Sequence, residues 1–130
     1  MATRNLTAVN REWSFINAQT NLKLIDVGAT QHLEAYYYQV IAANSNSVDV
    51  SCRIGTGATA LPTVTDDSAT PAPGTLLSHG GIPRGGGVVG HMGGAPILIG
   101  VQGEDLYLTC SVPTGGSLRV VIQLRVVEDA

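Results

Sequence analysis

The feature that most constrains the fold is a pair of alternating segments near the end of the chain, residues 104–112 and 117–127. Every second residue is apolar from Leu106 to Val112 and again from Leu118 to Val126. A period of two residues is typical of a half-buried β-strand. Pro113-Thr114-Gly115-Gly116 joins the two segments, and because Pro stops a ladder and Gly tolerates positive φ, we expect a β-hairpin.

The charge content limits the kinds of partner. At 130 residues the chain has the size of one domain. Seven basic and ten acidic residues give a net charge of −3, which provides no positive field for a nucleic-acid backbone, so we expect no nucleic-acid partner. Only 13% of the residues are charged, whereas the surface of a soluble monomer is usually about 25–35% charged. Burial of surface in an oligomer or a particle would account for this deficit.

The sequence predicts neither a signal peptide nor a membrane span. The first residues form no apolar run, and no later stretch approaches the roughly 18 apolar residues of a membrane helix. We therefore expect synthesis in the cytoplasm and no membrane partner. Cys52 and Cys110 lie on the apolar faces of two strand-like segments. A disulfide is open to them if these strands are neighbours, but a reducing compartment favours buried free thiols.

The first third of the chain favours short strands. Residues 3–9 are a candidate arm or edge strand, and residues 12–17 and 22–27 predict two strands joined by a turn at 18–21. Residues 30–43 fit a helical spacing as well as a strand.

Three consecutive tyrosines, Tyr36 to Tyr38, followed by Val40-Ile41 favour the strand for residues 30–43. Residues 44–47 then predict a turn into the alternating segment 48–54.

Residues 74–103 differ from the rest of the chain. They hold eleven of the sixteen glycines, and Arg84 is their only charged residue. Apolar stretches of strand length occur within them at 75–78, 87–90 and 96–101. Glycine this dense is typical of bulges, tight corners or a backbone that approaches a neighbour closely.

The whole pattern predicts an all-β protein. A further short strand is predicted at 60–64 and a loop at 65–74. About eight short strands, separated by turns every 8–12 residues or so, indicate a β-sandwich of jelly-roll-like type. We expect one domain over residues 1–130, with residues 1–10 as a candidate arm.

No arrangement of side chains predicts catalysis, a metal ion or a cofactor. Residues 55–60 spell the G-x-G-x-x-A of a dinucleotide-binding turn, but Leu61-Pro62 follows where that motif needs a helix. The histidines and cysteines lack metal-ligand spacing, and only His79 and His91, which flank a glycine-rich loop, are a pair that folding can bring together. We expect no enzymatic activity, no metal and no cofactor.

Aromatic residues are candidates for binding. Trp13 and Tyr37 combine an apolar ring with a polar group, which suits contacts with sugars and with other proteins. If residues 30–43 form a strand, either Tyr37 or the pair Tyr36 and Tyr38 points away from the core. Trp13 and Tyr37 are therefore candidates both for glycan contact and for an interface.

Two stretches of the second half, Gly80-Gly-Ile-Pro-Arg-Gly-Gly-Gly-Val-Val89 and residues 103–126, resemble small virion proteins of tailed bacteriophages and of phage-derived gene transfer agents. The similar features are a G-I-P-x-G loop, a strand ending in C-S-V-P-T-G-G and a final hydrophobic strand. The resemblance implies a β-sandwich subunit on the surface of a phage-like particle made in the bacterial cytoplasm. It implies a head decoration protein or the base of a head spike or fibre, whose partners are the major capsid protein and a fibre or spike protein. No catalytic residues come with it.

We therefore expect a non-enzymatic virion structural protein that forms a homo-oligomer, with residues 1–10 and 74–103 making contacts. The alternative is a carbohydrate-binding β-sandwich module that attaches to cell-surface glycans. Val121 and Val127 lie among polar residues on the otherwise wet face of the last strand, which predicts that this face meets another subunit or sheet. The candidate interface residues are Trp13, Tyr37, Arg84, Arg119, Val121 and Arg125.

Overall fold

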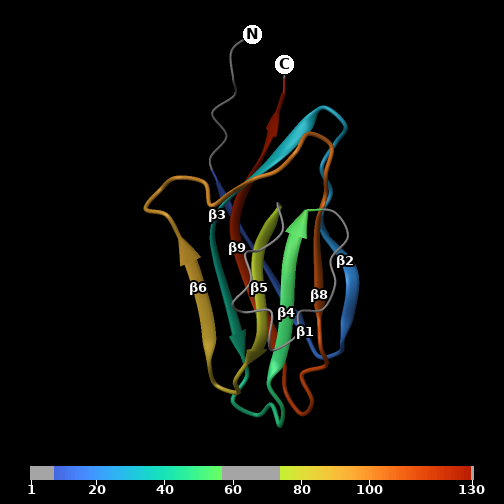
Figure 1. Ribbon diagram of the computed structural model, residues 1–130, viewed down its shortest axis with the longest axis vertical. Helices are drawn as coiled ribbons and strands as arrows, with labels where there is room; N and C mark the ends of the chain where they lie inside the picture. Colours follow the sequence, from blue (N-terminus) through green and yellow to red (C-terminus); the bar gives the residue numbers. More distant parts are fainter. Residues whose placement is uncertain (1–7, 57–73, 130) are drawn as a thin grey trace.

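The computed structural model describes residues 8–56 and 74–129 and forms two antiparallel sheets packed face to face (Figure 1). One sheet has the strand order β1-β9-β3-β6, with the short β7 also paired to β3, and is called the β9 sheet below. The other has the order β2-β8-β4-β5 and is called the β8 sheet. The strands are β1 (Val9–Phe15), β2 (Gln19–Ile25), β3 (Gln31–Ala42), β4 (Val50–Thr56), β5 (Thr75–Ile82), β6 (Gly87–His91), β7 (Leu98–Ile99), β8 (Leu106–Cys110) and β9 (Leu118–Glu128).

Successive long strands mostly alternate between the two sheets. Of the long strands that follow one another in sequence, only β4 and β5 are paired within one sheet. This is the strand order of a jelly roll, and the described residues contain no helix. The predicted all-β, jelly-roll-like sandwich is therefore confirmed, as is the strand prediction for residues 30–43, which contain β3.

The predicted hairpin at the end of the chain is wrong. β8 lies between β2 and β4, whereas β9 lies between β1 and β3, so Pro113–Gly116 crosses from one sheet to the other. The turn between β3 and β4 holds this crossing in place. Ser47 N donates to Thr114 O at 2.8 Å, and Asn46 Nδ2 donates to Ser117 O at 3.1 Å. A side chain at position 116 would collide with Asn46 Oδ1, so the glycine is needed for this close approach.

The turn predicted at residues 18–21 is also misplaced. β1 ends at Phe15 and β2 already begins at Gln19, so the turn covers residues 16–18. The first residues of β2 are polar, which is why they were predicted as a turn. They belong to an edge strand that is irregular there: its register shifts beside β8, and Asn21 has a positive φ of 47°. Residues 9 and 10 of the candidate arm belong to β1. Residues 1–7, the strand predicted at 60–64 and the loop at 65–73 lie outside the described residues.

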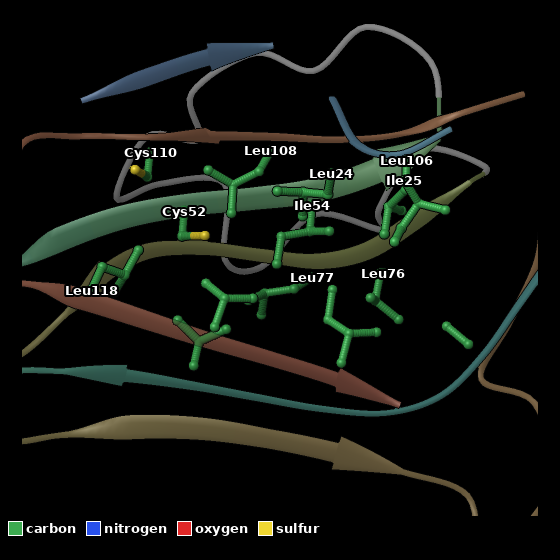
Figure 2. Packing of buried hydrophobic residues seen from close by; sticks show 14 of the residues in the cluster. Leu24, Ile25, Cys52, Ile54, Leu76, Leu77, Leu106, Leu108, Cys110 and Leu118 are labelled. Atoms are coloured by element: carbon green, nitrogen blue, oxygen red, sulfur yellow. The ribbon is translucent and has the colours of Figure 1, made fainter. Parts of the chain in front are cut away.

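Apolar side chains from both sheets fill the space between them (Figure 2). Those of Ile54, Leu108 and Ile122 are completely buried, and burial of each such side chain contributes about 1.5–3 kcal/mol to folding. Cys52 and Cys110 lie within this layer as directly paired residues of β4 and β8. Both are buried free thiols, which confirms the interpretation that the sequence favoured.

Candidate functional site

The outer face of the β9 sheet carries two of the three consecutive tyrosines. A register shift in β3 beside β9 lets Tyr36 and Tyr37 share this face, while Tyr38 packs against the core. Tyr37 stacks on His91 of β6 with 6.4 Å between ring centroids, and Tyr36 Oη donates to Glu34 Oε1 at 2.7 Å. Strict alternation allowed only Tyr37, or Tyr36 with Tyr38, to point outward. The bulge produces a third arrangement.

A network of charged side chains surrounds Glu34 on the same face. Arg125 Nε donates to Glu34 Oε1 at 2.7 Å. The two ring nitrogens of His32 lie 3.0 Å from Glu34 Oε2 and 2.7 Å from Asp129 Oδ1. Partial burial by itself raises the pKa of Glu34, but hydrogen bonds from His32, Tyr36 and Arg125 outweigh it and lower this pKa to about 2. The hydrogen bond with Glu34 in turn raises the pKa of His32.

A second ion pair joins β1 and β9. Arg119 Nε donates to Glu12 Oε1 at 2.6 Å, with both side chains exposed. Arg119 and Arg125 were both candidate interface residues, and each has an acidic partner within its own chain. Val121 is partly buried on the outer face between them, and Val127 is buried beside its paired residue His32.

The other two candidate interface residues lie elsewhere. Trp13 is on the inner face of β1 and packs against the core, so it does not lie beside Tyr37. Arg84 is exposed in the turn between β5 and β6. Tyr37, Arg119, Val121 and Arg125 therefore share one face, and the structure does not bring Trp13 or Arg84 to it.

A row of exposed apolar side chains follows the open edge of the β9 sheet. Val89, Met92, Ile99 and Val101 are each more than half exposed, and we call these four residues the β6–β7 edge. Within the described residues, β6 and β7 pair with β3 alone, so their other side is open. Apolar side chains beside an unpaired strand are typical of association sites. The sequence predicted contacts over residues 74–103 as a whole. It did not single out these four residues, because their exposure depends on where β6 and β7 pair with β3.

A groove of about 590 Å³ opens on the opposite side, between β1 and β2. Its lining combines five apolar residues with four charged ones: Val9, Leu24, Ile25, Leu124 and Val126 with Arg11, Lys23, Asp26 and Arg125. Arg11 also lines the groove and forms no ion pair with any residue that the structure describes. No sequence signal indicated this groove, because it depends on how two edge strands of different sheets diverge.

The described residues contain no group of three or more His, Cys, Asp and Glu side chains arranged to hold a metal ion. His79 of β5 and His91 of β6 belong to different sheets. His79 Nδ1 accepts a hydrogen bond from Gly81 N at 3.1 Å, whereas His91 stacks on Tyr37. The part of the chain that the structure describes has no helix that could span a membrane.

No protein-family model, curated protein or solved structure matches this chain.

Proposed function

We propose that this chain is a non-enzymatic structural protein on the surface of a phage-like particle and that it forms a homo-oligomer. The observation that carries the proposal is the β6–β7 edge, with four large apolar side chains more than half exposed beside an open strand. Burying apolar surface is the dominant driving force of most protein association, at about 25 cal/mol per Å². Val89 and Ile99 pair with Gln39 and Glu34 of β3, so the exposed apolar side chains extend along this edge.

The charges on the β9 sheet support contact between copies. Glu12 is paired with Arg119, and Glu34 with Arg125, so these side chains have no need of a partner in another molecule. With only 13% charged residues in the chain, little repulsion or charge desolvation opposes association.

The particle itself is supported by two weaker arguments. The jelly roll is a fold used by viral capsid proteins as well as by lectins, which is an argument by fold analogy. Residues 80–89 and 103–126 resemble small virion proteins, whose position on the capsid makes the major capsid protein and a fibre or spike protein the expected partners.

The homo-oligomer is tested by sedimentation velocity of the purified chain across the micromolar range. We expect a species whose mass is at least twice the 13.5 kDa chain mass. A single species of 13.5 kDa at every concentration would overturn the proposal.

One observation favours glycan binding as a second function. Tyr37 is paired with Gln123 of β9, and Gln123 with Asn10 of β1, so an aromatic ring and two amide groups form one row on the outer face. Rings and amides are suited to the apolar faces and hydroxyl groups of neutral sugars. We expect binding on a glycan array that is lost in Tyr37→Ala and kept in Tyr107→Ala, a tyrosine of the other sheet. An array with no bound glycan excludes this function.

A further inference from the structure

The backbone of β6 has hydrogen-bonding groups on its open side. Ala42 N donates to Gly86 O at 2.9 Å, one position before the first pair of β3 and β6. Because such bonds alternate along an antiparallel pair, Val88 and Gly90 are the residues of β6 that bond to β3. The N–H and C=O groups of the other three residues point away from β3, and these residues are Gly87, Val89 and His91. We call these three residues the open ladder.

Nothing within β6 protects the open ladder from another strand. Sheet edges are commonly guarded by a charged side chain, a proline or a bulge. The strand contains no proline and no Lys, Arg, Asp or Glu, and its five pairs with β3 follow one another without a register shift. Figure 1 shows β6 at one side of the molecule, and among the described residues its neighbour is β3 alone. The strand is therefore suited to pair with a further strand.

The sequence of β6 fits a second copy of itself. When two copies run antiparallel with Val89 opposite Val89, Gly87 lies opposite His91, and Val88 lies opposite Gly90. In this register each residue of the open ladder meets another one, so every outward N–H and C=O of both copies is paired. The two central valines are a favourable cross-strand pair, and each other side chain lies opposite a glycine. A shift by two residues leaves part of the ladder unpaired.

The absence of charge favours a second copy as the occupant of this edge. In a two-fold contact a strand meets itself, so a charged side chain near the axis would face its own sign, which is destabilising. Arg84, in the turn before β6, is the only charged residue of residues 74–103. An unrelated partner is commonly selected by complementary charges, and β6 offers none for such a partner to recognise.

We propose that two copies of this chain associate about a two-fold axis at Val89, through antiparallel pairing of β6 with β6. This inference rests on the proposed homo-oligomer and names the strand through which the copies meet. The β9 sheets of both copies then form one continuous sheet. Met92 and Ile99 follow His91 along the same edge, so they extend the contact toward the turn that precedes β6 in the second copy.

Amide hydrogen exchange followed by NMR tests this pairing residue by residue. The amide protons of Gly87 and His91 should be protected in the associated chain and at least about tenfold less protected in the monomeric variant Val89→Lys. The amides of Val88 and Gly90 bond to β3 in either state, so they are the internal control. Equal exchange of Gly87 and His91 in the oligomer and the monomer would overturn the strand pairing and leave the homo-oligomer standing.

Val89→Lys also tests the position of the axis. It should raise the dissociation constant of the dimer more than about tenfold, because two lysines then lie opposite each other. Val112→Lys is the matched control, since Val112 follows β8 and is 46% exposed, against 53% for Val89. It should change the constant less than about twofold. Circular dichroism with thermal unfolding checks that both variants fold, and equal constants for the two would overturn the two-fold pairing.

Val89→Pro separates strand pairing from apolar contact. Proline keeps an apolar side chain but removes the outward N–H, and an edge strand tolerates it where that N–H faces away from its neighbour. We expect a folded monomer of 13.5 kDa in sedimentation velocity. A folded variant that remains oligomeric would show that the copies meet without pairing β6, which overturns this inference alone. A monomeric wild-type chain would overturn the homo-oligomer as well. If the proline prevents folding, Val89→Lys and hydrogen exchange still decide.

Discussion

Arg125 donates a 2.7 Å hydrogen bond from Nε to Oε1 of Glu34, the residue paired with it across β9 and β3. The same contact recurs at 2.6 Å between Arg119 and Glu12 on the same face of the sheet. The surroundings differ, because the side chains of Glu34 and Arg125 are 14% and 28% exposed, and those of Glu12 and Arg119 are 55% and 52% exposed. The chain thus contains a partly buried ion pair and a matched exposed one.

Glu34→Gln should lower the free energy of unfolding by about 1.5–3 kcal/mol, because Arg125 and His32 lose a charged acceptor at a poorly solvated site. Glu12→Gln should cost less than about 1 kcal/mol, since water replaces the exposed partner. Urea titration of both variants gives the two values. Similar losses would mean that burial does not distinguish the two pairs.

The stability of the protein should depend on the charge of His32. Its hydrogen bond with Glu34, helped by Asp129, raises the pKa of His32 above the ordinary 6.5. A raised folded-state pKa means that the stabilisation is fully present below about pH 6.5 and is lost as the pH rises through the folded value. The difference in unfolding free energy between wild type and His32→Gln should therefore shrink with rising pH. A difference that stays constant or grows over this range would contradict the role assigned to His32.

Gly90→Ala should destabilise the fold by about 1–3 kcal/mol through overpacking. Gly90 of β6 is paired with Tyr38, and an added Cβ would overlap the Tyr38 ring, which packs against the core. Gly81→Ala is the control, since its nearest contact is an ordinary 3.5 Å to Asp49 Cβ. Thermal unfolding compares the two variants, and equal melting temperatures would show that Tyr38 yields without cost.

The two cysteines should be inert in the folded protein. Burial raises the pKa of the Cys52 thiol, with a smaller contribution from Cys110, and burial also raises the pKa of Cys110. Ellman's reagent should therefore react with neither thiol under native conditions and with both in denaturant. Rapid reaction of the folded protein would place at least one sulfur outside the core.

The strands of this chain were predictable where burial alternates. Leu106, Leu108 and Cys110 follow the same period-2 pattern as the inward residues of β9, because both strands have one face on the core. That pattern cannot say which sheet a strand joins, since the inner faces of both sheets look alike in sequence. The crossing at Pro113–Gly116 depends on the distant Asn46, and local patterns carry no information about such a contact.

The candidate site was predictable only in part. The sequence left open whether Tyr37 or the pair Tyr36 and Tyr38 points outward, and Tyr36 and Tyr37 both do so because the bulge in β3 interrupts the alternation that the prediction assumed. Trp13 was expected at a surface and instead packs on the inner face of β1. The groove lies between β1 and β2, which belong to different sheets. No local sequence pattern indicates which sheet a strand joins, so the groove could not be predicted.

The molar mass of one matched pair of variants tests most directly whether the β6–β7 edge joins copies of the chain. Ile99 on that edge and Ile16 in the turn after β1 are 62% and 68% exposed, so an aspartate disturbs folding equally little at either position. Light scattering after size exclusion should give a multiple of 13.5 kDa for wild type and for Ile16→Asp, and 13.5 kDa for Ile99→Asp. The same mass for all three proteins would contradict self-association through this edge.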